Sequence, residues 1–258
     1  MESATDVAAA PRSGPSPLKL ADRADGESRR AASLAWYGLA VLLMTTLFAL
    51  VVRQMLSLIG PSLQTSLGFN DLQIGILQGL GMAIFACVAS YPMGWLADRY
   101  GRRLLLAIGV CIWSLATLFC AFQHSFGGLF AGTIGIAIGE AGLAPIVYAM
   151  IPDLFPERKR NTANLIFYAG TLFGAGIGMA LGGAMLEWLA TSPAILPAAL
   201  AGVDSWRIAM VALALPGPLF FLLVATMPLA RHRASLTPAH RGGDAAADAF
   251  LPYAKAHW

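Results

Sequence analysis

Six long apolar runs, separated by short polar segments, limit what this chain can fold into. At 1.5 Å per helical residue, each run is long enough to cross the roughly 30 Å hydrocarbon core of a bilayer. Lipid offers the backbone no hydrogen bonds, so a spanning segment must satisfy its own N–H and C=O groups, as a helix does. The sequence therefore predicts an all-α membrane protein with six transmembrane helices, over residues 34–59, 74–96, 104–122, 127–152, 163–188 and 206–229.

The composition also fits lipid better than water. Hydrophobic residues make up 57% of the chain and charged residues 12%, against about 25% charged in an average soluble domain. The three cysteines, Cys87, Cys111 and Cys120, lie inside apolar runs without the spacing of a disulfide framework or a zinc site. We expect them to be packing residues, and we expect no metal, no cofactor and no nucleic acid as a partner.

Basic residues alternate from one side of the predicted bundle to the other. Both tails and the loops after the second and fourth helices carry them, whereas the loops after the first, third and fifth helices do not. Because cytoplasmic loops are enriched in Lys and Arg, both termini are predicted to face the cytoplasm. Arg53 and Arg207 depart from this alternation. The basic residues that agree with the alternation include Arg23, Arg29, Arg30, Arg99, Arg102, Arg103, Arg158, Lys159, Arg160, Arg231 and Arg233.

The two tails differ from the bundle at residues 33–230. Residues 1–32 are rich in Ala, Ser, Pro, Asp and Arg without apolar periodicity, so we expect a disordered cytoplasmic tail. Residues 231–258 turn polar and then carry several aromatic residues. We interpret them as a cytoplasmic interdomain linker that leads to a second half missing from this chain. A natural cytoplasmic tail is the alternative.

The loop between the second and third helices reads Gly-Trp-Leu-Ala-Asp-Arg-Tyr-Gly-Arg-Arg over residues 94–103. Glycines let helices approach closely, Asp98 can accept hydrogen bonds from a helix N-terminus, and Arg102 can pair with a carboxylate. This loop resembles the signature loop of the major facilitator superfamily. The resemblance implies a cytoplasmic gate, and ordinary loop charges are the alternative. The expected gate residues are Gly94, Asp98, Arg99, Gly101, Arg102 and, where the fourth helix ends, Asp153.

Residues 34 to 233 resemble more closely the bacterial spinster-like branch of that family. The resembling segments are 53–54 (Arg-Gln), 139–141 (Gly-Glu-Ala), 151–156 (Ile-Pro-Asp-Leu-Phe-Pro) and 206–207 (Trp-Arg). The resemblance implies the N-terminal half of a secondary transporter, a six-helix domain built as a 3+3 inverted repeat. Members usually have Asp just before the helix 1 Arg, whereas this chain has Val52.

The resemblance also implies partners and a location. The substrate would be a small organic or amphiphilic, lipid-like solute, moved by alternating access. A C-terminal six-helix half would complete the carrier in the plasma (inner) membrane, in contact with membrane lipids. Proton-coupled symport and uniport both remain open, since the usual Asp is absent.

Arg53 and Glu140 are the charged residues that function must explain. A charge near the bilayer centre costs about 2.5–3.5 kcal/mol on insertion scales, so such residues pair or line water-filled cavities. Burial disfavours the ionised form of a carboxylate such as Glu140, whereas a nearby Arg53 favours it. We predict that these two residues bind substrate or couple transport to protons. A purely structural ion pair is the alternative.

Glycines recur at four-residue steps in the fifth helix, at Gly170, Gly174, Gly178 and Gly182. A small-residue face of this kind permits close helix packing in lipid. We predict a packing seam, with a sliding surface between two halves as the alternative.

Two other functions fit the sequence less well. An intramembrane protease is disfavoured because the histidines lie outside the apolar runs and no Gly-x-Ser-x-Gly motif occurs. We therefore expect that this protein is not an enzyme. A truncated, non-transporting membrane scaffold that binds partner helices remains the alternative to a transporter half.

Overall fold

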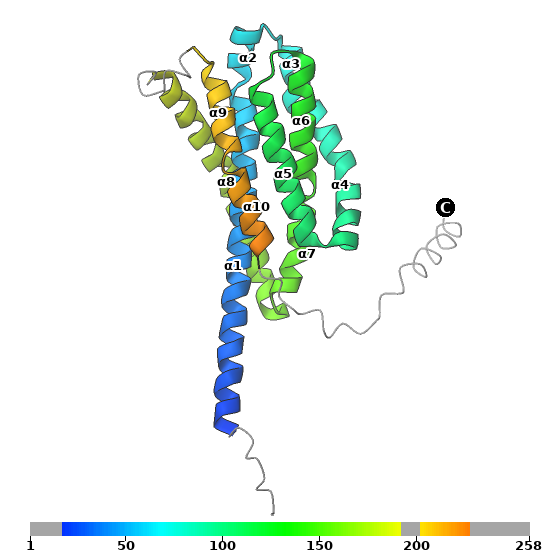
Figure 1. The fold of residues 1–258 in the computed structure, drawn as a ribbon, viewed down its shortest axis with the longest axis vertical. Helices are drawn as coiled ribbons and strands as arrows, with labels where there is room; N and C mark the ends of the chain where they lie inside the picture. Colours follow the sequence, from blue (N-terminus) through cyan, green and yellow to red (C-terminus); the bar gives the residue numbers. More distant parts are fainter. Residues whose placement is uncertain (1–16, 192–201, 228–258) are drawn as a thin grey trace, which may run out of the picture. The chain divides into compact units, whose positions relative to one another are not determined.

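The computed structural model describes residues 17–191 and 202–227, which are helical apart from short connections (Figure 1). Six stretches of these residues are long and apolar enough to span a membrane: Ser28–Leu58, Asp71–Tyr100, Arg102–Ala121, Phe126–Leu154, Glu157–Thr191 and Ser205–Thr226. The predicted all-α membrane protein with six transmembrane helices is confirmed. The expected linker at residues 231–258 lies outside the described residues.

Several spans consist of more than one helical element. In chain order the elements are α1 (Pro17–Leu58), α2 (Gly60–Leu67), α3 (Asp71–Gly75), the π-helix η1 (Ile76–Leu80), α4 (Gly81–Tyr100), α5 (Arg102–Ala121), α6 (Phe126–Ala141), α7 (Leu143–Leu154), α8 (Glu157–Thr191), α9 (Ser205–Ala214) and α10 (Gly217–Thr226). The spans alternate in direction. We call the end where α4 meets α5 the Arg102 end, and the end where α9 begins the Arg207 end.

The first helix begins earlier than expected. Residues 17–32 were predicted to belong to a disordered tail, but α1 starts at Pro17 and continues without a break to Leu58. Proline is favoured in the first turn of a helix, and the Ala, Leu, Lys, Arg and Glu that follow are good helix formers. The helix of the first span therefore extends into the polar segment. Residues 1–16 lie outside the described residues.

Prolines interrupt two of the spans. In the sixth span, α9 ends at Ala214 and α10 begins at Gly217, with Pro216 between them. In the fourth span, α6 ends at Ala141 and α7 begins at Leu143, shortly before Pro145. Proline lacks a backbone N–H and its ring clashes with the preceding turn, so each break lies just ahead of a proline. Pro218 follows the break in the sixth span, and Pro145 follows the break in the fourth.

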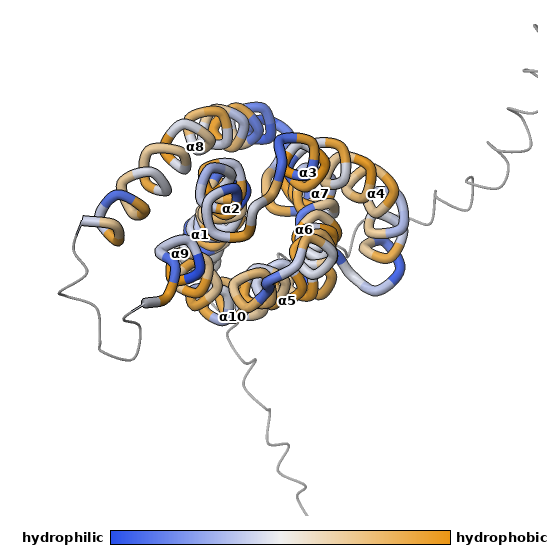
Figure 2. The backbone as a smooth tube through the Cα atoms, turned by 90° about the horizontal axis from the view of Figure 1, so that it is seen from above, coloured by the Kyte–Doolittle hydropathy of each residue, from blue (hydrophilic) through white to orange (hydrophobic). Residues whose placement is uncertain are grey.

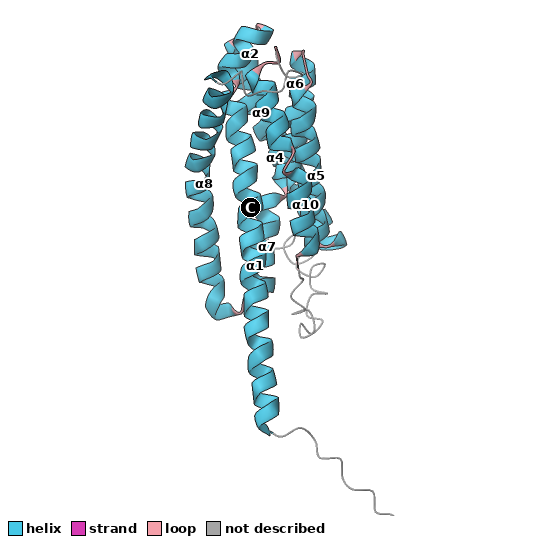
Figure 3. Ribbon diagram, turned by 60° about the vertical axis from the view of Figure 1, so that its left-hand side comes forward, coloured by secondary structure: helices cyan, strands magenta, loops and turns pink. Residues whose placement is uncertain are grey.

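Two spans lie at opposite edges of the bundle. Viewed along its axis, α4 and α8 flank a group that contains α1, α5 and α6 (Figure 2). α8 runs beside α1 (Figure 3), α4 packs on α6, and α5 packs on α6, α9 and α10. Within an apolar 18-residue stretch of each span, only 17% of the residues are buried in the span that contains α4 and 22% in α8, against 33% to 56% in the other spans. The outer faces of α4 and α8 are therefore apolar surface open to lipid or to another helical domain.

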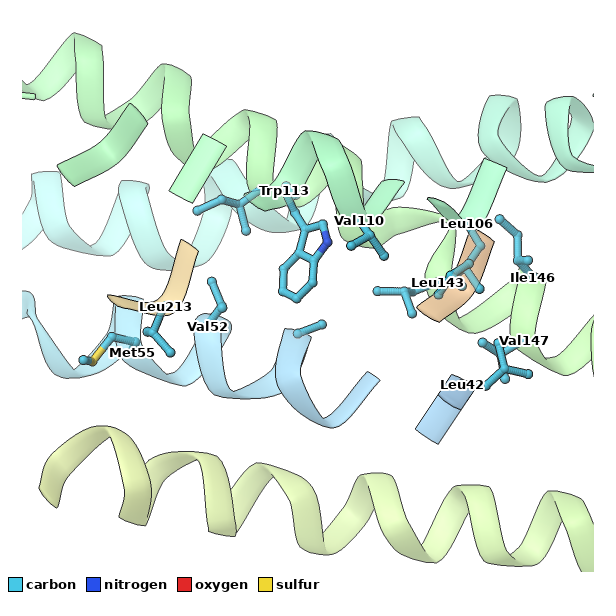
Figure 4. Close-up of a cluster of buried hydrophobic side chains, with 14 of the residues drawn as sticks. Leu42, Val52, Met55, Leu106, Val110, Trp113, Leu143, Ile146, Val147 and Leu213 are labelled. Atoms are coloured by element: carbon cyan, nitrogen blue, oxygen red, sulfur yellow. The ribbon is translucent and has the colours of Figure 1, made fainter. Parts of the chain in front are cut away.

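Apolar side chains of α1, α5, α7 and α9 fill the interior (Figure 4). Trp113 of α5 packs edge-on against Phe48 of α1, with 5.7 Å between ring centroids, and Phe48 stacks on Phe220 of α10 at 4.8 Å. Val52 belongs to the same buried cluster. An unpaired carboxylate is costly in such surroundings. The apolar side chain at position 52 therefore suits the packing of this chain.

The glycine face of α8 is turned toward α1. A Cβ added at Gly170 would lie 2.6 Å from Leu43 Cδ1, one at Gly178 would lie 3.1 Å from Val51 Cα, and one at Gly182 would lie 2.9 Å from Leu58 Cδ1. Gly174 meets Leu47 in the same way. The four glycines predicted to form a packing face thus contact a helix of this same six-helix unit.

Candidate functional site

Glu140 lies beside the break in the fourth span. It is the next-to-last residue of α6 and the central residue of the span Phe126–Leu154. The preceding residue, Gly139, has no room for a side chain, since an added Cβ would lie 2.7 Å from Trp113 N and 2.8 Å from Gly109 O on α5. This close approach fixes the α6 backbone against α5. The carboxylate at position 140 is therefore held midway along the span.

Glu140 and Arg53, the two residues predicted to act together, are near each other but not bonded. Arg53 of α1 lies within electrostatic range of Glu140. Among the ion pairs of the described residues, however, none joins the two side chains. Arg53 is exposed, whereas Glu140 Oε1 is buried and accepts no hydrogen bond from the described part of the chain. A buried polar atom without a partner is rare and calls for a functional explanation.

The residues predicted to form a gate meet at the Arg102 end. Arg102, the first residue of α5, donates from Nη1 to Asp153 Oδ2 at 2.7 Å and to the Ala149 carbonyl at 2.6 Å. Its Nη2 lies 3.4 Å from Asp98 Oδ1 on α4. The structure thus brings Asp98, Arg102 and Asp153 together. All three keep contact with solvent, because their side chains are 71%, 32% and 61% exposed.

The other residues of the loop motif have local roles. Gly101 has a φ of 102°, a backbone conformation that favours glycine, at the turn between α4 and α5. The Arg99 guanidinium lies 5.3 Å from the centroid of the Trp95 ring. Gly94 was expected to allow close helix approach, but a Cβ there would meet nothing within 4 Å in the described chain. Any close neighbour of Gly94 would therefore have to come from outside these residues.

Sequence reasoning missed the role of Arg207. Its side chain donates from Nη1 to the Ala121 carbonyl at the end of α5, at 2.8 Å, and from Nε to Asp204 Oδ2 at 3.2 Å. The guanidinium also lies 4.4 Å from the centroid of the Trp206 ring. In the sequence this arginine was visible only as an exception to the alternation of basic loops. Here it joins the sixth span to the third.

Three polar side chains inside the spans were also missed. Each donates to a backbone carbonyl of another span, close to a helix break: Gln78 Nε2 to Leu56 O at 2.7 Å, Ser90 Oγ to Ala141 O at 3.2 Å, and Ser114 Oγ to Ala214 O at 2.9 Å. For the two serines a sequence signal existed, because a proline stands four residues after each acceptor.

Within the described residues, no group of three or more His, Cys, Asp or Glu could hold a metal ion.

Comparison with known proteins agrees with this architecture. The family model for the Major Facilitator Superfamily matches residues 42–256. Sphingosine-1-phosphate transporter SPNS2 of Danio rerio is 31% identical over 122 residues, which are 46% of this chain and 24% of that protein. The probable L-galactonate transporter of Escherichia coli (strain K12) is 29% identical over 230 residues, which are 86% of this chain and 47% of that protein.

A solved structure gives the same result. The crystal structure of a bacterial homolog of the human lysosomal transporter Spinster, inward-facing and unoccupied, matches with a TM-score of 0.67 and 27% identity, over 76% of this chain and 43% of that one. The chain spans less than half the length of each of these three proteins. The expected fold, one six-helix domain of this family, is confirmed. The chain is therefore a spinster-like member of the Major Facilitator Superfamily, a family of membrane transporters and not of enzymes.

Proposed function

We propose that this chain is the N-terminal half of a secondary transporter that moves a small organic or amphiphilic anion by alternating access. One observation carries the proposal. Within the described residues, a carboxylate oxygen of Glu140 is buried without a hydrogen bond at a break in the middle of a span, within electrostatic range of the exposed Arg53. Transporters typically place their binding sites near the midplane at such discontinuous helices.

The anion is inferred from Arg53 and from two relatives. Sphingosine-1-phosphate and L-galactonate, which appear in the names of the relatives, carry a phosphate and a carboxylate. A guanidinium binds both groups with two parallel hydrogen bonds. Arg53 is exposed and not held in an ion pair by the described residues, so it is free to take such a headgroup.

Proton coupling is assigned to Glu140. An unpaired carboxylate in apolar surroundings is more costly when ionised, whereas a nearby guanidinium favours the ionised form. Binding of an anion to Arg53 would weaken that second influence, so that Glu140 takes up a proton when substrate is bound. With Val52 in the core, coupling rests on Glu140 alone, and a carrier without that coupling would be a uniporter.

Orientation and partner belong to the same proposal. The Arg102 end, which is rich in basic residues, faces the cytoplasm of the inner membrane, and both termini lie on that side. A second six-helix half covers the exposed faces of α4 and α8. Asp98, Arg102 and Asp153 form a gate that closes the cytoplasmic side when the two halves meet there.

Transport by a carrier that contains both halves tests the two central residues. In proteoliposomes with L-galactonate or sphingosine-1-phosphate as substrate, we expect Glu140→Gln to flatten the pH dependence of the uptake rate. Arg53→Ala should raise KM about tenfold or more, because it removes a charge-assisted hydrogen bond worth roughly 1.5–3 kcal/mol. Arg53→Lys is the matched control, since it keeps the charge but loses the two-pronged geometry.

The outcomes separate coupling from structure. An unchanged pH profile in Glu140→Gln would make Glu140 a structural residue and remove the coupling proposal. Loss of protein from the membrane in Arg53→Ala, with Arg53→Lys restoring both protein level and uptake, would indicate a charge needed for folding. Saturable uptake by this chain alone would contradict the need for a second half.

A further inference from the structure

The break between α6 and α7 leaves one backbone carbonyl without its helical partner. In a continuous helix the carbonyl of Ala141 would accept a hydrogen bond from the N–H of residue 145, but Pro145 has none. Ser90 of α4 supplies a donor, since its Oγ lies 3.2 Å from the Ala141 carbonyl and 2.8 Å from the Ala86 carbonyl of its own helix. The hydroxyl has one hydrogen, which these two acceptors share.

A second contact from α4 reaches the same break one turn later. A Cβ added at Gly142 would lie 3.2 Å from Met93 Cβ, so α4 packs directly against the turn between α6 and α7. In the hydrocarbon region an unpaired carbonyl costs several kcal/mol, and neighbouring helices or Ser and Thr side chains usually satisfy it. The hydroxyl of Ser90 therefore donates to the Ala141 carbonyl, and Met93 packs against the turn at Gly142.

Glu140 is the residue immediately before this carbonyl. Its backbone is fixed from the α5 side at Gly139 and from the α4 side at Ala141 and Gly142. We propose that Ser90 is a positioning residue for Glu140, whose hydroxyl sets the geometry of the α6–α7 break and through it the environment of the carboxylate. This inference deepens the proposed function and rests on it, because it assigns Ser90 a role in the coupling assigned to Glu140.

Among the described residues, few charged groups lie on the helices packed around Glu140. Arg53 of α1 acts on it electrostatically. The charged residues of α4, α5 and α7, the helices packed on α6, lie toward the Arg102 end: Asp98, Arg99, Arg102, Arg103 and Asp153. Removing the Ser90 hydroxyl changes none of these charges. A change in the titration of Glu140 would therefore report a change in its position or its hydration.

The chain provides a matched control in the sixth span. Pro218 leaves the carbonyl of Ala214 free in the same way, and Ser114 of α5 donates to it at 2.9 Å. Both serines are half-buried, and both link a neighbouring helix to a proline break. In sequence, Ala214 has only uncharged neighbours, whereas Glu140 directly precedes Ala141, so the two carbonyls differ in what they stand next to.

The test is an infrared pH titration of the chain in lipid nanodiscs, with the Glu140 carboxyl band assigned by its loss in Glu140→Gln. We expect Ser90→Ala to move the titration midpoint by about half a pH unit or more, a roughly threefold change in proton affinity. Ser90→Thr, which keeps the hydroxyl, should restore it, and Ser114→Ala should leave it unchanged. In a Pro145→Ala background the Ala141 carbonyl regains its helical donor, so Ser90→Ala should then have a smaller effect.

Equal midpoints in Ser90→Ala, Ser114→Ala and the unmodified chain would overturn the positioning role, even if Glu140→Gln alters transport as proposed. If instead Glu140 keeps one protonation state over the whole pH range, the coupling proposal fails. The frequency of its carboxyl band, which responds to hydrogen bonding, then decides about Ser90. A frequency shift in Ser90→Ala and not in Ser114→Ala supports positioning, and no shift refutes it.

Discussion

Each end of this bundle is built around an arginine that donates to a carbonyl oxygen of a neighbouring helix, but the two arginines are held differently. At the Arg207 end the arginine side chain is 10% exposed and pairs with Asp204, just before its own helix. At the Arg102 end the side chain is 32% exposed, and its two acidic partners, Asp98 and Asp153, come from two other helices. Both of those carboxylates are mostly in solvent.

The difference indicates a fixed joint at the Arg207 end and an exchangeable contact at the Arg102 end. Moving Arg207 would strip a buried guanidinium of its carbonyl acceptor, so the link between the third and sixth spans should persist in every conformation. Exposed ion pairs contribute only about 0–1 kcal/mol, because water competes for both charges. Arg102 can therefore exchange partners at small cost. This comparison predicts that the Arg102 end opens and closes while the Arg207 end stays assembled.

The largest effect is expected for Arg207→Leu. The substitution leaves the Ala121 carbonyl without its donor and removes the cation over Trp206, so we expect about 2–3 kcal/mol of destabilisation. Thermal unfolding in detergent should show a clearly lower midpoint. Arg207→Lys should recover part of the loss, since an ammonium cannot reproduce the planar fork of hydrogen bonds. A midpoint equal to that of the unmodified chain would show that this end is not a fixed joint.

A smaller loss is expected in the seam that runs between the two ends. A Cβ at Gly178 would lie 3.1 Å from Val51 Cα, a backbone atom that cannot rotate away, so Gly178→Ala should cost about 1–2 kcal/mol. Gly176 is the matched control on the same helix, because a Cβ there meets nothing within 4 Å among the described residues. Gly176→Ala should be neutral or slightly stabilising. Equal unfolding midpoints for the two variants would contradict a tight seam between α1 and α8.

The sequence was enough to predict the spans and the cluster of Asp98, Arg102 and Asp153. Apolar runs reveal a helix in lipid, and Arg102 and Asp153 both stand at helix ends on the side where basic residues collect. The Arg207 joint was not predictable in this way, because its acceptor is a backbone carbonyl, which leaves no mark on the identity of residue 121. For Arg53 and Glu140 the sequence supplied the two charges but not the distance between them.

The Ser90 contact shows an intermediate case. Pro145 predicts a free carbonyl at Ala141, because a proline in a helix cannot donate to the carbonyl four residues before it. Which helix provides the donor depends on packing between α4 and α6, which no local pattern encodes. The sequence can therefore predict the unpaired carbonyl but not the residue that donates to it.

The smallest effect on stability, and the clearest effect on function, is expected for Arg102→Ala. A third of this side chain is already in solvent, and its ion pairs are exposed, so we expect less than about 1 kcal/mol of destabilisation. A change of that size still alters the ratio of two conformations severalfold. In a carrier with both halves, Arg102→Ala should therefore slow uptake severalfold while the amount of protein in the membrane stays the same.

The two carboxylates then tell whether Arg102 works as a switch or only as a local tie. Asp153 accepts a hydrogen bond at 2.7 Å within this half, whereas Asp98 lies 3.4 Å from the arginine and is the more exposed of the two. If Asp98 also takes a partner from the second half, Asp98→Asn should slow uptake as much as Arg102→Ala, although its bond here is the weaker one. If its role is confined to this half, Asp153→Asn should have the larger effect. Normal uptake in Arg102→Ala would contradict the proposed gate and indicate that both ends of the bundle are fixed joints.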